Sequence, residues 1–308
     1  MSIKTISKAV DRFLFAPTSP YPVAAFRILF GLLLLQHCLF IYGDLYNWYG
    51  AKSLALAQTV DLNNTFVCLN LFKFFPGNDL WLTAIYAAYV LAALALTLGY
   101  RSRIASIVIY LIIVSLYHRN PYLLNSGDTL VRVMSFWMVF APTGAAWSLD
   151  HRRKVKKYGF EFTELTPSWG LRCLQLQFCC VYFHAVITKI PGWVWVNGTA
   201  VYIASRIEAL MKFPLIPEPE HLFISQAISW MTLVIEAALF SVIWLRELRY
   251  YVLGLGICMH LTIDWCMNIP QFEWLMIASM VLFVFPGDLE CAFKRIKACC
   301  GYKKPCAT

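Results

Sequence analysis

A lysine stands at the end of a long apolar block, where an amine could take part in chemistry. Lys189 follows the nearly uncharged residues 171–188 and precedes Pro191 and Gly192. A lysine held partly out of water can give up its proton and act as a general base. The alternative is that its amine reaches out to the membrane interface. Lys189 is therefore the candidate catalytic residue, with both interpretations open.

Other polar side chains lie at the corresponding ends of this block and of other apolar blocks. They are His118, Arg119 and Asn120, then Asp128 and Arg132, then His184, and finally His260 and Asp264. Ionisable groups inside a membrane are costly, which makes them functional hypotheses by default. In the topology derived below these groups share one level, so we expect a single polar cavity that opens outward.

Each of these groups also has a simpler interpretation. Asp128 and Arg132 are one helical turn apart and can pair with each other. His260 and Asp264 share a helix face and can form a structural hydrogen bond. His184 can be a core histidine whose ring nitrogens are satisfied. Residue type and spacing leave all three interpretations open.

Two charges lie inside other apolar blocks. Arg27 stands one turn into the first block, where its side chain can reach inward to the interface. Glu236 lies near the middle of its block, and a carboxylate at that depth needs a partner or a proton.

The composition identifies the elements that must position these groups as membrane helices. Of 308 residues, 60% are hydrophobic and 14% are charged, against about 25% charged in a soluble domain. Backbone groups in lipid must be satisfied internally, and the short alternating segments of a barrel are absent, so the blocks should be helices. Eight blocks are expected, at residues 23–42, 80–98, 104–117, 128–140, 171–190, 222–245, 250–265 and 272–285.

The basic residues predict the orientation of these spans. The net charge of +9 would suggest nucleic acid in a soluble protein, but here the Lys and Arg residues cluster in alternate connecting segments, as in cytoplasmic loops. The chain is thus expected to be an all-α polytopic protein of the plasma or inner membrane, with both termini cytoplasmic and the lipid bilayer, not nucleic acid, as its partner. Residues 1–22 form a cytoplasmic segment, 23–286 the transmembrane domain and 287–308 a basic tail.

The eleven cysteines do not form a disulfide or metal pattern. Their number is odd, most are dispersed, five lie within apolar blocks, and none has zinc-ligand spacing, so no metal site is expected. Cys291, Cys299, Cys300 and Cys306 lie among lysines near the C-terminus, where they are either reduced thiols or sites of reversible palmitoylation.

Ordered motifs along the chain resemble a known family. Residues 27–31 (RILFG) resemble its opening helix, and Asn120-Pro121 with Gly127-Asp128 resembles its bacterial NP…GD loop. Residues 147–150 (WSLD) resemble the segment that closes the next span. The most specific match is a series of polar and aromatic residues within one apolar block and the turn after it: Leu171, Arg172, Gln177, Tyr182, Phe183, Lys189, Trp195 and Gly198. The chain resembles the HTTM (horizontally transferred transmembrane) domain of vitamin K-dependent gamma-glutamyl carboxylases and their bacterial relatives.

The resemblance implies a role for Lys189. The matching lysine of the carboxylases is assigned as the base that deprotonates reduced vitamin K, in a reaction that uses oxygen and carbon dioxide to carboxylate a protein glutamate. Reduced vitamin K or menaquinone is therefore the expected cofactor, and Trp195 joins the candidate cavity. The chain departs from the carboxylases in two ways. About twenty residues follow its last predicted span, and the carboxylase histidine before the fourth span falls near Gly127.

Three functions follow as hypotheses. The first is a lysine-based carboxylase or oxygenase acting on a quinone or lipid. The second is a maturation factor for a secreted peptide, working with a small partner protein, because the resemblance extends to a compact bacterial relative required to mature a sporulation-delaying peptide toxin. The third is a transporter, which Glu236 keeps open although no internal repeat is visible. Catalysis requires the amine of Lys189, whereas a scaffold should tolerate arginine.

Overall fold

The computed structural model describes residues 3–54, 69–160, 163–213, 222–269 and 271–299. These residues are almost entirely helical, which confirms the predicted all-α fold. The long helices are α2 (Tyr21–Tyr42), α5 (Asp79–Leu98), α6 (Ser102–Arg119), α7 (Ser126–Phe140), α9 (Trp169–Lys189), α12 (Leu222–Phe240), α13 (Arg249–Cys266) and α14 (Phe272–Met280). Each of the eight predicted blocks overlaps one of them. Cys300 and Cys306 of the predicted tail lie outside the described residues.

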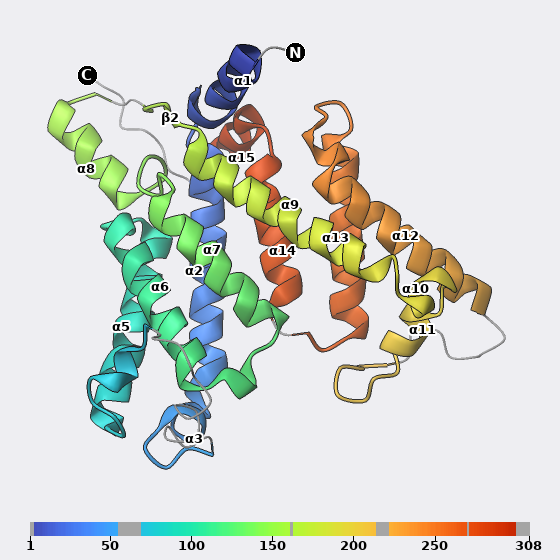
Figure 1. Ribbon diagram of the computed structural model, residues 1–308. Helices are drawn as coiled ribbons and strands as arrows, with labels where there is room; N and C mark the ends of the chain where they lie inside the picture. The colour runs from blue at the N-terminus through green and yellow to red at the C-terminus, as the bar shows by residue number, and fades with distance from the viewer. Residues whose placement is uncertain (1–2, 55–68, 161–162, 214–221, 270, 300–308) are drawn as a thin grey trace.

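Shorter elements cover the ends of the bundle (Figure 1). They are α1 (Ile3–Phe15), α3 (Leu45–Tyr49), η1 (Leu71–Lys73), η2 (Pro121–Leu123), α8 (Leu149–Tyr158), α10 (Trp193–Val196), α11 (Ala200–Ala204), η4 (Val242–Trp244), η5 (Val281–Phe283) and α15 (Pro286–Cys299). The two-residue strands β1 (Pro17–Thr18) and β2 (Thr166–Pro167) pair antiparallel and join α1 to the segment before α9.

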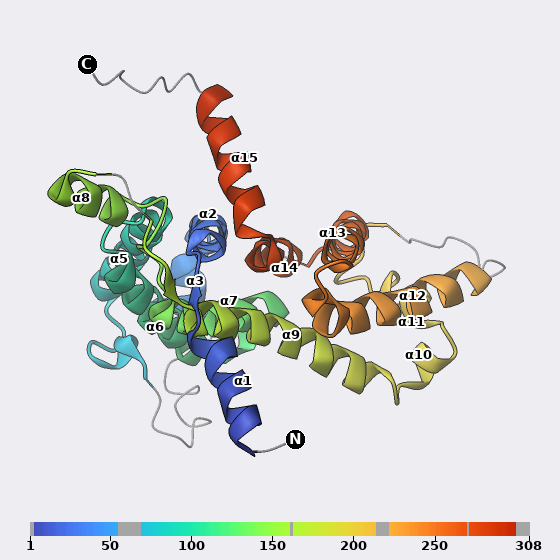
Figure 2. The same cartoon turned by 90° about the horizontal axis from the view of Figure 1, so that it is seen from above.

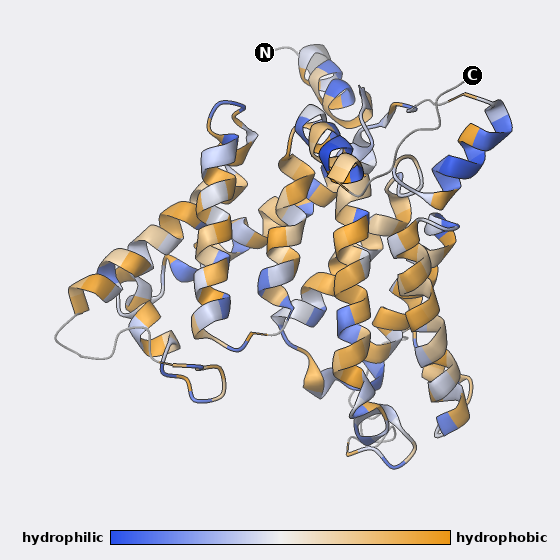
Figure 3. Ribbon diagram, turned by 180° about the vertical axis from the view of Figure 1, so that it is seen from behind, coloured by the Kyte–Doolittle hydropathy of each residue, from blue (hydrophilic) through white to orange (hydrophobic). Residues whose placement is uncertain are grey.

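Neighbouring helices pack in chain order, and the bundle closes on itself. Helix α2 packs on α5, α5 on α6, α6 on α7, α7 on α9, α9 on α12, and α12 on α13. Helix α14 then returns against α2 and α7. Helices α9 and α12 run obliquely to the others and carry α10 and α11 at their far ends (Figure 1). The bundle helices are mainly hydrophobic along their lengths (Figure 3), as lipid contact requires.

The number of spans is not settled by helix length and apolarity. Five described helices are long and apolar enough to cross a membrane alone: α2, α5, α6, α9 and α12. A sixth span arises only if α14–η5 and α15 count as one, although they are bent by 111° at their junction. Helix α7 has 15 residues, about 22 Å, against a hydrocarbon thickness of about 30 Å. Helix α13 carries Arg249, His260 and Asp264. The count of eight therefore stays a prediction.

Helices α1 and α15 leave the bundle sideways (Figure 2). In Figure 1 they lie at the same end as both termini and the basic helix α8. Hydrophobic residues Ile6, Val10 and Ile296 are exposed on them, beside basic residues. This combination is typical of helices that lie in the membrane interface.

A buried arginine fastens the same end of the bundle. Arg27 of α2 is fully buried, and its guanidinium donates to the carbonyl oxygens of Thr143 (3.0 Å) and Trp147 (2.6 Å). Asp150, three residues after Trp147, accepts hydrogen bonds from the backbone N–H groups of Arg101 (2.7 Å) and Ser102 (2.8 Å) at the start of α6. The RILFG and WSLD motifs therefore meet here, joining α2, α6 and the α7–α8 connection.

A glycine sets the crossing of the first two long helices. A Cβ added to Gly31 would lie 2.9 Å from the Thr97 Cα and 2.2 Å from its Oγ1. Only a residue without a side chain allows α2 and α5 to approach this closely.

Replacing Arg27 tests how much its bonds to the Thr143 and Trp147 carbonyl oxygens stabilise the fold. The Arg27→Met variant keeps the volume but leaves two carbonyl oxygens without donors, which costs about 1–3 kcal/mol for each buried group. We expect a clear fall in the thermal midpoint of purified protein in detergent, followed by circular dichroism. The Arg103→Met variant removes an exposed arginine from α6 and should change the midpoint little. Equal midpoints for the two variants would contradict the role given to Arg27.

Single cysteines test the orientation. In a background with all eleven native cysteines replaced, Lys52→Cys reports the end that carries α3, and Lys156→Cys reports α8. An impermeant maleimide should label the first variant in intact cells and the second only after permeabilisation, because basic segments stay cytoplasmic. The reverse pattern would show that the positive-inside assignment is wrong.

Candidate functional site

Lys189 is the last residue of α9, and the turn after it folds back over its side chain. Pro191 cannot continue the helix, and the Gly192 N–H donates to the Lys189 carbonyl at 2.9 Å. Helix α10 then brings Trp195 back, so that the Lys189 amine lies 4.7 Å from the centre of the indole ring. The lysine thus gains a cation–π contact from its own neighbouring segment.

The charged partner of Lys189 is Glu236 of α12. The lysine Nζ donates to Glu236 Oε1, and the side chains are 24% and 9% exposed, respectively. The sequence predicted that Glu236 needs a partner or a proton, and α9–α12 packing supplies the partner. Glu236 Oε2 is buried and accepts no hydrogen bond from the residues that the structure describes. The carboxylate is therefore only half satisfied.

A sharp corner at Gly198 holds Trp195 in place. Gly198 has a φ of +73°, and its carbonyl accepts from the hydroxyl groups of Ser225 (2.8 Å) and Ser229 (3.1 Å) on α12. A Cβ at this position would stand 2.5 Å from the Gln226 Cα. Both the backbone conformation and the space therefore call for glycine, which explains its place in the sequence signature.

A second chain of polar contacts crosses from α9 to α14. The Tyr182 hydroxyl lies 2.6 Å from His260 Nε2, and His260 Nδ1 contacts the Glu273 carboxylate. All three side chains are buried. Because an ionised carboxylate can only accept, Nδ1 carries a hydrogen, and in the neutral ring Nε2 then accepts from tyrosine. The result is a carboxylate–imidazole–phenol relay in which each contacting atom has a partner.

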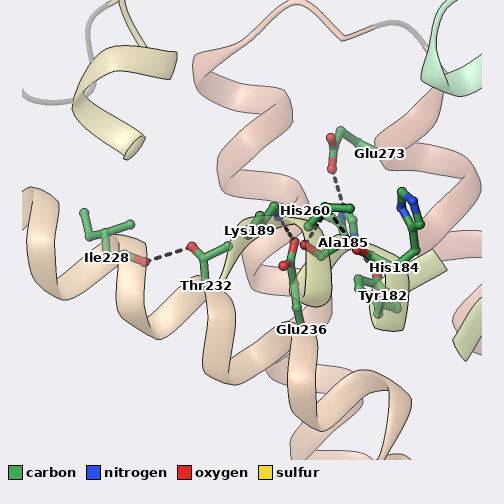
Figure 4. Close-up of polar contacts among 10 residues, drawn as sticks. Tyr182, His184, Ala185, Lys189, Ile228, Thr232, Glu236, His260 and Glu273 are labelled. Carbon is green, nitrogen blue, oxygen red and sulfur yellow. Dashed lines mark hydrogen bonds and ion pairs between the residues drawn. The ribbon is translucent and has the colours of Figure 1, made fainter. Parts of the chain in front are cut away.

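The pair and the relay face one another. Figure 4 shows Lys189, Glu236, Tyr182 and His260, from three helices, directed toward a common region. The charges of Glu236 and Glu273 both interact electrostatically with Tyr182. The site therefore combines an amine, two carboxylates, an imidazole and a phenol, a set suited to moving protons. Sequence reasoning missed Glu273, although a carboxylate inside an apolar block is the kind of signal that marks a functional candidate.

Two sequence interpretations near this site are corrected. His260 does not bond Asp264 in its own helix, because Glu273 and Tyr182 occupy both ring nitrogens. The Asp264 carbonyl instead accepts from the Lys212 amine. His184 is not a buried core histidine: its side chain is exposed on α9, and its carbonyl accepts from Thr188.

The remaining predicted residues form a second set on α6 and α7. Arg119 donates to the Gly50 carbonyl (2.9 Å) and the Ser53 hydroxyl (2.7 Å), and Asn120 donates to the Trp48 carbonyl (3.1 Å). These bonds fasten the loop around α3. Such partners are distant in the chain, so spacing gave no signal for them.

Asp128 and Arg132 do not pair with each other. Asp128 forms a capping box with Asn125 and lies 3.4 Å from His37 Nε2. The Arg132 guanidinium lies 3.7 Å above the Tyr117 ring, next to which His118 packs edge-on. The expected residues thus fall into two sets of contacts instead of one: Lys189, Trp195 and His260 in one, and residues 118–132 in the other.

Comparison with known proteins identifies the family. The HTTM domain model matches residues 15–287. An uncharacterised protein of Bacillus subtilis, YitO, is 22% identical over 253 residues, covering 77% of this chain and 78% of the relative. No solved structure matches the chain. The family match spans most of the sequence and contains every residue of both sets, so this helical membrane protein belongs to the HTTM domain family.

Proposed function

We propose that the chain is a membrane enzyme in which Lys189 removes a proton from an acidic hydroxyl of a reduced quinone or a lipid. The observation that carries this proposal is the group of titratable side chains near the amine. Lys189 contacts Glu236, and the Tyr182–His260–Glu273 relay faces the same region. General acid–base catalysis needs such groups positioned within an apolar, largely dry setting.

Glu236 gives the lysine a route to its neutral form. Transfer of one proton from the Lys189 ammonium to the Glu236 carboxylate leaves both groups uncharged, and the amine can then take the proton of a substrate O–H. The electron pair of that bond stays on the substrate oxygen. The Oε2 atom of Glu236 supports this proton transfer, because no described residue donates a hydrogen bond to it. Trp195 covers the amine with an apolar face.

The proposed reaction lies on the outer side of the plasma or inner membrane. The basic segments assign the end with both termini to the cytoplasm, and Lys189 ends a helix that begins at that end (Figure 1). A substrate dissolved in the bilayer can reach this depth without leaving lipid. Reduced vitamin K and menaquinone both have the acidic hydroxyl and the apolar body that this placement suits.

One observation favours the second candidate, a maturation factor for an exported peptide. The Glu236 carboxylate balances the positive charge of Lys189, and this ion pair joins α9 to α12. A scaffold that presents a surface to a peptide or a small partner protein would use the pair as a structural link only. The two functions differ in whether the amine must lose its proton.

The first test measures oxygen-dependent epoxidation of reduced vitamin K or menaquinone by protein in lipid nanodiscs. Wild type should turn over, and Lys189→Ala should lose about 10²–10⁴-fold in rate, the usual worth of a positioned general base. The Lys212→Ala variant removes a neighbouring lysine outside the site and should keep its rate. Absence of turnover with any of these quinones in folded wild-type protein would contradict the enzyme proposal.

The second test distinguishes a general base at Lys189 from a purely structural ion pair. Lys189→Arg keeps the positive charge and the ion pair, but a guanidinium stays protonated and cannot serve as a base. For an enzyme we expect a thermal midpoint close to wild type and no turnover. Glu236→Gln leaves Lys189 partly buried without its counter-charge, which costs about 3–5 kcal/mol when a buried pair is broken. Full turnover in folded Lys189→Arg protein would rule out the base and favour the scaffold.

A further inference from the structure

A polar cavity lies in the other half of the bundle, away from the Lys189 contacts. It measures about 200 Å³ and is bordered by α2, α3, α7 and the residue before α14. Its polar lining consists of His37, Asp44, Asn125, Asp128 and Gln271. Three aromatic residues, Phe40, Trp48 and Tyr49, line it as well. Among the described residues, this lining contains two acids but neither lysine nor arginine.

The acidic wall is held rigidly. Asp128 is fixed by its capping box with Asn125, which sets the start of α7. His37 lies 3.4 Å from Asp128 Oδ1 through Nε2 and 2.8 Å from the hydroxyl of fully buried Tyr89 through Nδ1. The cavity wall thus has its own carboxylate–imidazole–phenol contact, and here the carboxylate borders open space.

Gln271 adds an acceptor that lacks a donor. Its side chain lines the cavity, and the residue is 5% exposed with a φ of +63°. Its Nε2 donates to the Leu33 carbonyl at 3.0 Å, which fixes the amide. No described residue donates to its Oε1. A buried acceptor without a donor costs about 1–3 kcal/mol, and Oε1 itself is closed off from the cavity.

We propose that this cavity binds a protonated amine. The Asp44 and Asp128 carboxylates offer acceptors, and the aromatic rings offer faces that attract organic cations. Among the described residues, no group of three or more His, Cys, Asp or Glu side chains is arranged for a metal ion. The volume suits a small head group better than a drug-sized ligand, whose pockets are about 300–1,000 Å³.

The ammonium group can be free or carried by a lipid. Phe40 lines the cavity and is 55% exposed on α2, so the cavity borders the lipid-facing surface of the bundle. An ethanolamine head group of the adjacent leaflet has the required chemistry, and so does soluble ethanolamine. This ligand site is independent of the proposed Lys189 reaction.

The test uses ethanolamine as a soluble probe and phosphatidylethanolamine as a lipid probe. Thermal midpoints of the detergent-solubilised full chain are measured against ethanolamine concentration at constant ionic strength, with ethylene glycol as the uncharged control. A ligand that binds only the folded state raises the midpoint, and above its Kd the stabilisation grows with the logarithm of its concentration. Native mass spectrometry then compares retention of phosphatidylethanolamine and phosphatidylglycerol with the same acyl chains.

Wild type should be stabilised by ethanolamine or should retain phosphatidylethanolamine preferentially, and the arm that responds identifies the source. Asp44→Asn and Trp48→Leu should each weaken binding about tenfold or more, the equivalent of 1.4 kcal/mol. Neither residue is in the capping box, so both variants should fold. Asp288→Asn, which removes a carboxylate from α15, should bind like wild type. Equal effects of ethylene glycol, no response in either arm, or unchanged binding by both cavity variants would overturn the proposal.

Discussion

A charged or polar side chain in an apolar bundle must find its partner within the protein, and this constraint organises the structure. Water is absent from the hydrocarbon layer, so each unpaired group costs several kcal/mol. The buried Arg27 meets two carbonyl oxygens from the α7–α8 connection. Lys189 meets Glu236, and His260 meets Tyr182 and Glu273. In every case the partner comes from another segment of the chain. The same contacts that satisfy the charges therefore also decide which helices lie side by side.

The two ends of the molecule differ in the kind of contact they contain. One end has structural contacts to backbone groups, and the other has contacts between titratable side chains. At the end with both termini, Arg27 donates to two backbone carbonyl oxygens and Asp150 accepts from two backbone N–H groups, while Arg27 Nε has no partner among the described residues. Toward the other end, carboxylates, imidazoles and phenols face each other or border a cavity. Backbone partners fix geometry, whereas pairs of titratable side chains can exchange protons. The difference in partner type is the physical reason for looking for function at the second end only.

The sequence predicted the helices well because apolar blocks bounded by turns and charges directly report burial in lipid. It predicted that Glu236 needs a partner, and α9–α12 packing supplies Lys189. It offered Asp264 as one possible partner for His260, because a spacing of four residues indicates neighbours on one helix and gives no information about Glu273 on another. It also expected one cavity where the contacts form two sets, since charge order gives depth along the membrane normal but no lateral position. The short α7 and bent α14 show why block counting alone leaves the number of spans open.

The hydrogen bonding of the Lys189–Glu236 pair helps to decide whether the pair has a structural or a catalytic role. A buried ion pair is often no more stabilising than apolar side chains of similar volume, so stability alone is a weak reason for its presence. In this pair Glu236 Oε2 also lacks a donor among the described residues, which raises the cost of burial further. The neighbouring Tyr182–His260–Glu273 relay has a partner at each contacting atom and already joins α9, α13 and α14. The relay does not include α12, which the Lys189–Glu236 pair joins to α9. The unpaired Oε2 of Glu236 beside this relay is the feature of the pair that supports the proposed proton transfer.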